Sequence, residues 1–444
     1  MSAIITTKFR FQSAANLLNA IGGNGSQTPE SYYLFIGRSM AWPIADASPT
    51  TPQDRMFDEV DAMQNMLALK KITSTYVSHA VPRHNWVSGT TYYEYDDQDA
   101  NLYSKQFYVV TDDLNCYKCI KAGAGVSINK PTGTSATLGI PGNDGYQWKF
   151  MFQLTGGDVN KFLTSTFLPV KKLSVDDASL QWPIQAGAIN GGIHRIKIIS
   201  GGSGYQAKPT ITITGNGTGC VVNASDITLT NGVVTEIAVD PANAGINYSQ
   251  ATITIAGGNP TVSATARAVI SPQGGHGSDP VRELGGYYIM IDSQLVADEG
   301  SGDFIVDNDF RQIGLIRNPI ERMSGAVGTA TTYTALTTLD YSNVQGTAFT
   351  KDLQVIGQTS SAIAIIDSVD SVNGLIRVHQ NASTGFKSFT VGETIQVGTS
   401  TAILDTITLP EIVLNTGEVV YIENLSPVNR NISQTEDIKL VLEL

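Results

Sequence analysis

Residues 437–444 read DIKLVLEL, and this stretch indicates the fold class. Apolar Ile438, Leu440, Leu442 and Leu444 alternate with other residues, which include the charged Asp437, Lys439 and Glu443. Successive side chains of a β-strand point to opposite faces, so this pattern is typical of a strand with one buried face. We expect the stretch to be a core strand, and the segments before it to be arranged to receive it.

The residues just before this strand predict a partner for it. Residues 417–423 read GEVVYIE, which suits a second strand, and residues 424–427 read NLSP, which is a turn signal. Residues 411–444 are therefore expected to form strand, turn and strand. Further strands are predicted at residues 4–10, 31–38, 91–95, 105–110, 115–121 and 147–154. In the last of these, Trp148, Phe150, Phe152 and Leu154 are expected to face a core.

The sequence pattern predicts few helices. Residues 53–71 carry Met56, Val60, Met63 and Leu67 at spacings of three and four, which predicts a long amphipathic helix packed on a sheet. A brief helix capped by Ser13 and ending near Ala20 is also expected, with residues 22–25 (GGNG) as its stop signal. The chain is thus predicted to be mainly β, with few helices.

Two stretches differ in composition from the rest. Residues 187–277 and 345–410 are rich in Gly, Thr, Ser, Ile and Val, and the first holds a repeat in which Gly204-Tyr205 and Pro209–Ile213 recur as Asn247-Tyr248 and Ala251–Ile255. We interpret both as small all-β modules inserted into the host domain. The host then comprises residues 1–186, 278–344 and 411–444.

Composition bounds the classes of function. The chain has 444 residues, a formal net charge of −12 and 15% charged residues, which disfavours binding to nucleic acid through phosphate neutralisation. Its start lacks the apolar core of a signal peptide, and no apolar run reaches the roughly 18 residues that a membrane span needs. We therefore expect no membrane insertion, and three cysteines cannot supply a disulfide framework.

The short motifs predict no chemistry. Cys116 and Cys119 have the spacing of a redox pair or half a zinc site, but the pattern around them is a β-hairpin, and no second pair completes four ligands. The acidic loops at residues 96–99 and 298–309 match no standard calcium spacing, and solvated faces are the default interpretation. No catalytic residue, metal site or cofactor site is predicted, and an enzyme is not expected.

Several blocks of the host domain, taken in order, resemble one family. They are residues 5–10 (ITTKFR), 35–39 with Trp42, 80–86 (AVPRHNW), 142–148 (GNDGYQW), 310–313 with Asn318-Pro319, and 417–424 with Gln434–Glu436. The set resembles the baseplate wedge subunit of T-even-type contractile-tailed phages, the gene product eight class. The resemblance implies a layered β-sandwich, a homodimer, other baseplate wedge subunits as partners, and no enzymatic activity.

That family implies a structural protein of the virion, located in the tail baseplate and assembled in the host cytoplasm. Such a protein needs buried aromatic and arginine anchors at its interfaces. The candidate interface or structural anchors are Arg38, Trp42, Arg83, His84, Trp86, Trp148, Arg311 and Tyr421. The alternative is a carbohydrate-binding or depolymerising tail protein, in which the inserted modules bind the sugar.

Overall fold

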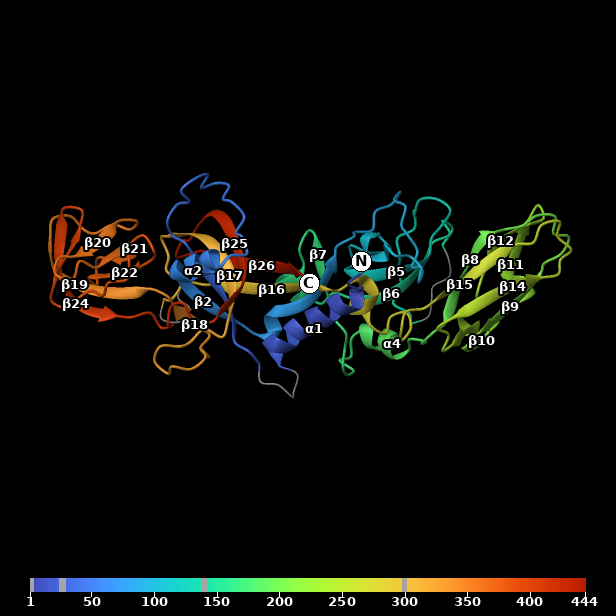
Figure 1. Cartoon of the computed structure of the whole chain (residues 1–444). Helices are drawn as coiled ribbons and strands as arrows, with labels where there is room; N and C mark the ends of the chain where they lie inside the picture. The colour runs from blue at the N-terminus through green and yellow to red at the C-terminus, as the bar shows by residue number, and fades with distance from the viewer. Residues whose placement is uncertain (1–3, 24–28, 137–141, 298–301) are drawn as a thin grey trace. The chain divides into compact units, whose positions relative to one another are not determined.

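The computed structural model describes residues 4–23, 29–136, 142–297 and 302–444. It divides into two compact units. Unit 1 comprises residues 1–14, 78–290 and 441–444, and unit 2 comprises residues 15–77 and 291–440. The division passes through helix α1 (Thr7–Gly22) and strands β16 (Tyr288–Leu295) and β26 (Glu436–Glu443). The prediction of a mainly β chain with few helices is confirmed (Figure 1).

A β-sandwich built from host residues belongs mainly to unit 1, with β16 and β26 divided between the units. One layer has the strand order β4-β5-β6, and the other has the order β26-β16-β3-β7. The bounds are β3 (Val77–Pro82), β4 (Tyr108–Val110), β5 (Asn115–Lys121), β6 (Gln147–Gln153) and β7 (Phe167–Val170), with helices α3 (Gly156–Phe162), α4 (Gln181–Ala186) and α5 (Pro280–Leu284) between strands.

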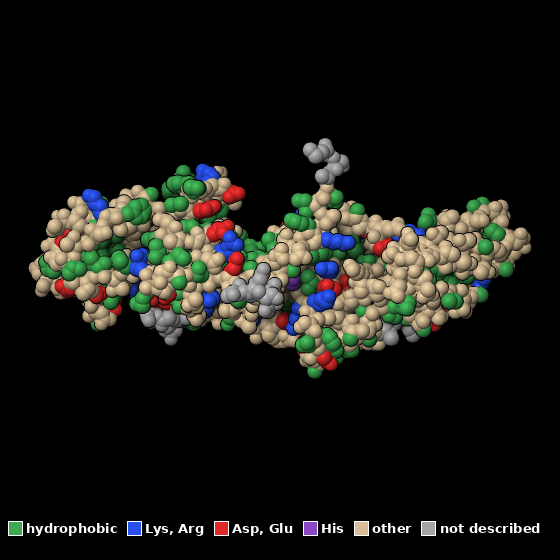
Figure 2. Space-filling view, turned by 60° about the horizontal axis from the view of Figure 1, so that its bottom comes forward, with side chains coloured by type: hydrophobic (Ala, Val, Ile, Leu, Met, Phe, Trp, Pro, Cys, Tyr) green, Lys and Arg blue, Asp and Glu red, His purple; other side chains and the backbone are tan. Residues whose placement is uncertain are grey.

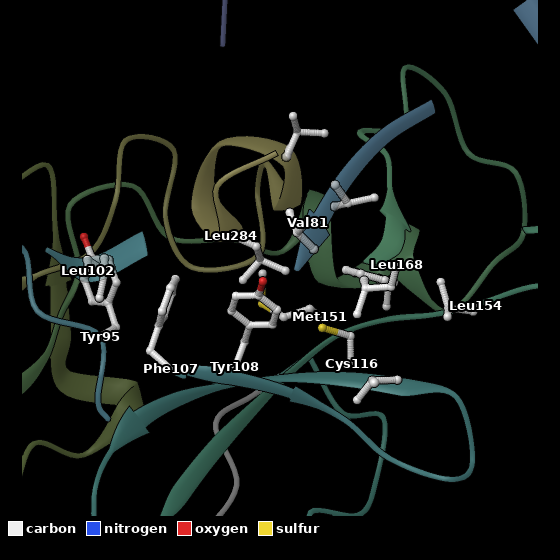
Figure 3. Close-up of a cluster of buried hydrophobic side chains, with 14 of the residues drawn as sticks. Val81, Tyr95, Leu102, Phe107, Tyr108, Cys116, Met151, Leu154, Leu168 and Leu284 are labelled. Carbon is white, nitrogen blue, oxygen red and sulfur yellow. The ribbon is translucent and has the colours of Figure 1, made fainter. Parts of the chain in front are cut away.

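The core of this sandwich lies between the two layers. Val81 of β3 and Leu168 of β7 come from one layer, and Tyr108, Cys116 and Met151 come from the other (Figure 3). All five side chains are buried. Each fully buried aliphatic side chain contributes roughly 1.5–3 kcal/mol. The two layers are therefore held together by burial of apolar surface.

Strand β6 differs from its prediction in one respect. Phe150, Phe152 and Leu154 are buried as expected and Trp148 is half-buried, but the intervening Lys149 and Met151 are buried as well. The strand is therefore covered on both faces, which simple alternation did not predict.

The first inserted stretch forms an all-β body within unit 1. Its strands are β8 (Ile193–Ser200), β9 (Thr210–Gly215), β10 (Thr218–Cys220), β11 (Ile227–Thr230), β12 (Val233–Ile237), β13 (Ala244–Ile246), β14 (Ala251–Ala256) and β15 (Thr265–Ile270). The two copies of the sequence repeat pair with each other, because β9 and β14 form one antiparallel ladder. Tyr205 and Tyr248, one from each copy, are both buried in the same core.

Unit 2 holds a third sheet of the host and a closed barrel. The sheet has the order β18-β2-β1-β17-β25, with β1 (Tyr32–Gly37), β2 (Met66–Ile72), β17 (Asp309–Arg317), β18 (Thr332–Thr334), β25 (Glu418–Asn429) and helix α2 (Met56–Gln64). The barrel has the order β19-β22-β21-β20-β23-β24, with β19 (Thr337–Gln345), β20 (Gln354–Gly357), β21 (Ile363–Asp370), β22 (Leu375–His379), β23 (Thr394–Val397) and β24 (Ser400–Thr408).

The barrel includes residues before the expected module start. Its first strand begins at Thr337, whereas the composition changes near residue 345. The domain boundaries given above stay a prediction.

The long helix expected over residues 53–71 is wrong. Helix α2 ends at Gln64, and residues 66–72 form β2, which pairs with β1 along its length. The methionine stripe is accordingly divided, because Met56 is exposed while Met63 is buried. Pairing in the centre of a sheet overrides helical periodicity here.

The chain start is also corrected. Residues 4–10 were expected to be a strand, but α1 begins at Thr7 and continues to Gly22. Ser13 lies inside the helix, where its hydroxyl donates to the Phe9 carbonyl at 3.1 Å rather than capping an end. The stop signal expected after it at residues 22–25 lies partly outside the described residues.

Two further expectations were wrong. Residues 91–95 form no strand, and residues 424–427 form no turn, because β25 continues to Asn429 through an irregular register against β17. Strands β25 and β26 also belong to different sheets instead of forming one hairpin. Of the four predicted aliphatics, only Leu440 is buried, and Ile438, Leu442 and Leu444 are half-buried.

Ion pairs join the first inserted body to the host part of unit 1. Lys197 donates to Asp96 at 2.9 Å, and Arg267 pairs with the same carboxylate. Arg195 contacts Glu94 at 3.3 Å. Burial by itself would raise the pKa of Asp96, but the hydrogen bonds from Arg267 and Lys197 lower it to about 2. The ionised carboxylate therefore stabilises the folded chain.

We expect Asp96→Asn to lower the free energy of unfolding by about 2 kcal/mol at pH 6. A depressed pKa gives stability that is fully present above the pKa of the unfolded chain. The difference between wild type and variant should therefore shrink as the pH falls from about 4 to about 2. Urea unfolding across this range measures it, and a difference that stays constant would contradict the role of the ionised group.

Candidate functional site

Four of the sequence-predicted residues lie in unit 2, and three of them form one cluster. The arginine–tryptophan cluster consists of Arg38, Trp42, Asp46 and Arg311. Arg311 on β17 is buried, and its guanidinium donates to Asp46 at 2.8 and 3.2 Å and to Asp309 at 3.1 Å. It also donates to the Ser39 carbonyl. Arg311 thus fixes the segment that follows β1.

Trp42 belongs to the same network through its polar atoms. Its backbone N–H donates to Asp46 at 2.8 Å, and its indole N–H donates to the carbonyl of Leu425 on β25 at 3.0 Å. Asp46 accepts from both Trp42 and Arg311, and the Arg311 hydrogen bond is the main reason that its pKa lies below the usual range. The cluster therefore ties the loop after β1 to β17 and β25.

Arg38 stacks on the tryptophan. Its guanidinium carbon lies 3.8 Å from the Trp42 ring centre, and Nη1 lies 3.3 Å from Asp61 of α2. Within the part of the chain described, Arg38 Nε is buried without a hydrogen-bond partner. Burial lowers the pKa of Arg38, although Asp61 opposes this change. A stacked, partly desolvated arginine of this kind is typical of interface hot spots.

The backbone at Arg38 is strained. Its φ is +59°, a left-handed conformation that arginine rarely adopts. The strain follows a bulge between Ile36 and Gly37, where a Cβ on Gly37 would lie 2.9 Å from the Asn65 carbonyl oxygen. Such strain costs of order 1–3 kcal/mol and persists only where the surroundings hold it. The bulge aims Arg38 toward Trp42 and Asp61.

A groove of about 800 Å³ opens beside Arg38. Arg38, Asp61 and Asn65 line one side, and barrel residues that include Asn381 and Gln396 line the other. Beside this groove, buried polar groups attach the barrel to the rest of unit 2. Ser39 donates to Asp367 at 2.6 Å, and His379 Nδ1 lies 2.8 Å from the same carboxylate. Asn381 donates to Asn65 at 3.0 Å.

Tyr421 lies apart from the arginine–tryptophan cluster. It is half-buried on β25 and donates its hydroxyl to Glu423 at 2.7 Å. Burial raises the pKa of this phenol, and the Glu423 hydrogen bond adds to the effect. The residue therefore stays neutral and serves as a hydrogen-bond donor.

The other four predicted residues lie in unit 1. Arg83 donates to Asn85 at 2.8 Å and to the Thr164 carbonyl at 2.8 Å, and His84 lies against the Tyr108 ring at 5.1 Å. Burial lowers the pKa of His84. Within the described residues, the hydrogen-bond acceptors of Arg83 are thus an amide oxygen and a carbonyl oxygen.

Trp86 and Trp148 pack against one buried aromatic cluster. Trp148 stacks on Tyr146 with ring centres 5.9 Å apart, and it meets Tyr92 edge-on at 5.5 Å. The Trp86 indole N–H donates to Ser127 at 3.2 Å. Both tryptophans thus act inside unit 1, as packing residues.

The CxxC pair has no reactive geometry. Cys116 and Cys119 are both buried on β5, and burial raises the pKa of each thiol, so both stay protonated. Among the described residues, no group of three or more His, Cys, Asp and Glu side chains is placed to hold a metal ion. Residues 298–301 of the acidic loop lie outside that part of the chain.

Sequence reasoning missed the partners that complete these sites. Asp46, Asp61, Asp367 and His379 match no motif or spacing in the sequence that would have signalled them. In the described residues no helix is long and apolar enough to span a membrane. Among the described residues visible in Figure 2, Lys and Arg side chains lie in small groups, and Asp and Glu side chains lie close to several of these groups.

Of the predicted arginine and tryptophan anchors, Arg311 is buried, and Arg38, Trp42, Trp86 and Trp148 are half-buried. No family model matches the chain. It is similar to a phage protein, baseplate wedge protein gp8 of Enterobacteria phage T4. The two are 24% identical over 189 residues, which covers 34% of this chain and 55% of the phage T4 protein. The match therefore spans about half of that relative's length.

Proposed function

We propose that the protein is a non-catalytic structural subunit of a phage tail baseplate wedge. The observation that carries this proposal is the similarity to baseplate wedge protein gp8. The ordered blocks of the host domain across residues 5–436 resemble the same family. The proposed location is the virion tail, with assembly in the host cytoplasm.

The proposed mechanism is mechanical. The chain forms a homodimer, and preformed surfaces hold neighbouring wedge subunits during assembly and are repacked when the sheath contracts. Unit 2 offers one such surface on residues 44–57, where Ile44, Met56 and Phe57 are 82%, 79% and 66% exposed. A contiguous exposed apolar patch is typical of an interaction site, and we propose that these side chains contribute to one. The arginine–tryptophan cluster fixes the start of this segment.

Substitution at this surface should impair assembly without unfolding the chain. We expect Phe57→Asp to reduce the titre of infectious particles at least tenfold, because it places a charge in a buried contact. Val372→Asp is the matched control, since Val372 is 92% exposed on the barrel, and it should leave the titre unchanged. Equal titres for the two variants would contradict a role for residues 44–57.

The proposed homodimer has its own measurement. Light scattering of the purified chain at micromolar concentration should give twice the mass of one chain, as a two-fold symmetric dimer requires. A monomer at that concentration would contradict the homodimer. The wedge role itself would then be tested by the titre measurement above.

The carbohydrate-binding alternative lacks support from the first module. Its aromatic side chains, Tyr205 and Tyr248, are both buried. The Tyr205 hydroxyl accepts from the Ala264 N–H at 2.8 Å, so the ring faces the module's own core. Neither ring is free to stack on a sugar.

A further inference from the structure

Unit 1 contains a cavity of about 320 Å³ whose lining includes buried basic side chains. Lys149 of β6 and His276 are both buried, and His194 of β8 lies beside His276 with ring centres 5.5 Å apart. The exposed residues of the lining include Gly187 and Ala242. Buried basic groups therefore lie at the base of an opening that reaches solvent.

The buried charges around this cavity do not balance. Lys118 pairs with Glu283, and both side chains are almost fully buried. Glu283 also accepts from the backbone N–H groups of Gly277 at 2.8 Å and Asp279 at 3.1 Å, so its oxygens are fully used. Lys149 donates to the Ala136 carbonyl, and among the described residues no carboxylate pairs with it. One positive charge is left without a counter-charge.

The two histidines add unused hydrogen-bonding capacity. Within the described part of the chain, Nδ1 of His194 and Nδ1 of His276 are buried without a partner. Burial, then Lys149 and Lys118, lower the pKa of His194 to about 4, and burial is also the main cause that lowers the pKa of His276. Both rings are neutral at pH 7, and each has one N–H to donate. Buried polar groups normally have hydrogen-bond partners, so the Nδ1 atoms of His194 and His276 indicate a ligand site.

We propose that this cavity binds a small oxyanion such as phosphate or a small carboxylate. Lys149 supplies the counter-charge, and the imidazole N–H groups of His194 and His276 donate to the anion's oxygens. A cation is disfavoured because two buried lysines lie beside the histidines. The volume far exceeds the roughly 30 Å³ that one water occupies, so an anion fits together with its remaining water.

Calorimetric titration of the full chain at pH 7 and constant ionic strength tests this proposal, with inorganic phosphate and acetate as separate probes. We expect one site per chain for at least one probe. Lys149→Met should weaken its binding at least tenfold, and Lys208→Met, at an exposed lysine of the same unit, should bind like wild type. Binding of neither probe, or equal binding by Lys149→Met and wild type, would overturn the proposal.

A second measurement needs no substitution and remains decisive if Lys149→Met does not fold. Nitrogen NMR of histidine-labelled wild-type chain should show shifts of the His194 and His276 ring nitrogens on addition of the bound probe. The resonances of His379, which lies in unit 2, serve as an internal control. Unchanged His194 and His276 resonances at saturating phosphate and acetate would overturn the site.

Discussion

Replacement of Arg430 by Met is expected to lower the free energy of unfolding by about 3–5 kcal/mol, because it leaves a buried carboxylate unpaired. The Arg430 side chain is 2% exposed, and its Nε donates to Glu436 at 3.0 Å. Its Nη1 donates to the Ile305 carbonyl at 2.9 Å. Glu436 is itself buried, so water cannot take the place of the guanidinium. Urea unfolding of the variant and the wild type measures the difference.

Two further variants isolate the cause. Arg430→Met combined with Glu436→Leu should recover most of the loss, because replacing a whole buried pair by apolar groups is often neutral. Arg10→Met removes an exposed pair with Glu443 and should have no measurable effect. A loss below about 1 kcal/mol for Arg430→Met, or no recovery in the double variant, would contradict the importance of this pair.

Deletion of residues 437–444 is expected to abolish cooperative unfolding. The deletion removes most of β26 from a four-stranded sheet and exposes the edge of β16. It also removes Leu440, which is buried, and Val441, which packs against a core cluster that includes Phe162 and Met290. Each buried aliphatic contributes roughly 1.5–3 kcal/mol, and most domains are stable by only about 5–15 kcal/mol.

Circular dichroism during heating checks this deletion. The truncated chain should show no sharp transition, whereas Glu443→Ala, which changes only an exposed ion pair, should melt like wild type. A truncated chain that stays soluble and melts cooperatively would show that β26 is dispensable.

Local patterns predicted the β content and the positions of the host strands β1, β4, β5, β6, β25 and β26. Alternation at residues 115–121 and 147–154 reflects strand geometry directly, and the structure has β5 and β6 there. The repeat of residues 209–213 at 251–255 predicted a duplicated unit, and the two copies pair as β9 and β14. These features depend on residues close together in the sequence.

The failures arose where distant pairing decided the structure. Residues 66–72 have helical periodicity, yet they form β2 because β1 provides a partner strand. Strand β26 has the expected alternation, but its sheet partner is β16 rather than β25. Neither the strand conformation of residues 66–72 nor the sheet partner of β26 can be predicted without knowing which strand lies alongside.

In the candidate site, too, residue types could be predicted from the sequence, whereas features that depend on distant pairing could not. The residue types Arg38, Trp42 and Arg311 were predicted as anchors, and the structure brings them into one cluster. Their joint partner Asp46 and the bulge at Gly37 were not predicted, because both depend on how β1, β2 and β17 are placed. Trp86 and Trp148 proved to pack within unit 1, which residue type alone could not distinguish from an interface role.

The wedge role is tested most directly by disrupting the gene in its phage and examining the particles by electron microscopy. We expect heads without complete contractile tails, and rescue by the wild-type chain supplied in trans. Complete tails with normal baseplates in the absence of the protein would contradict the proposed structural role.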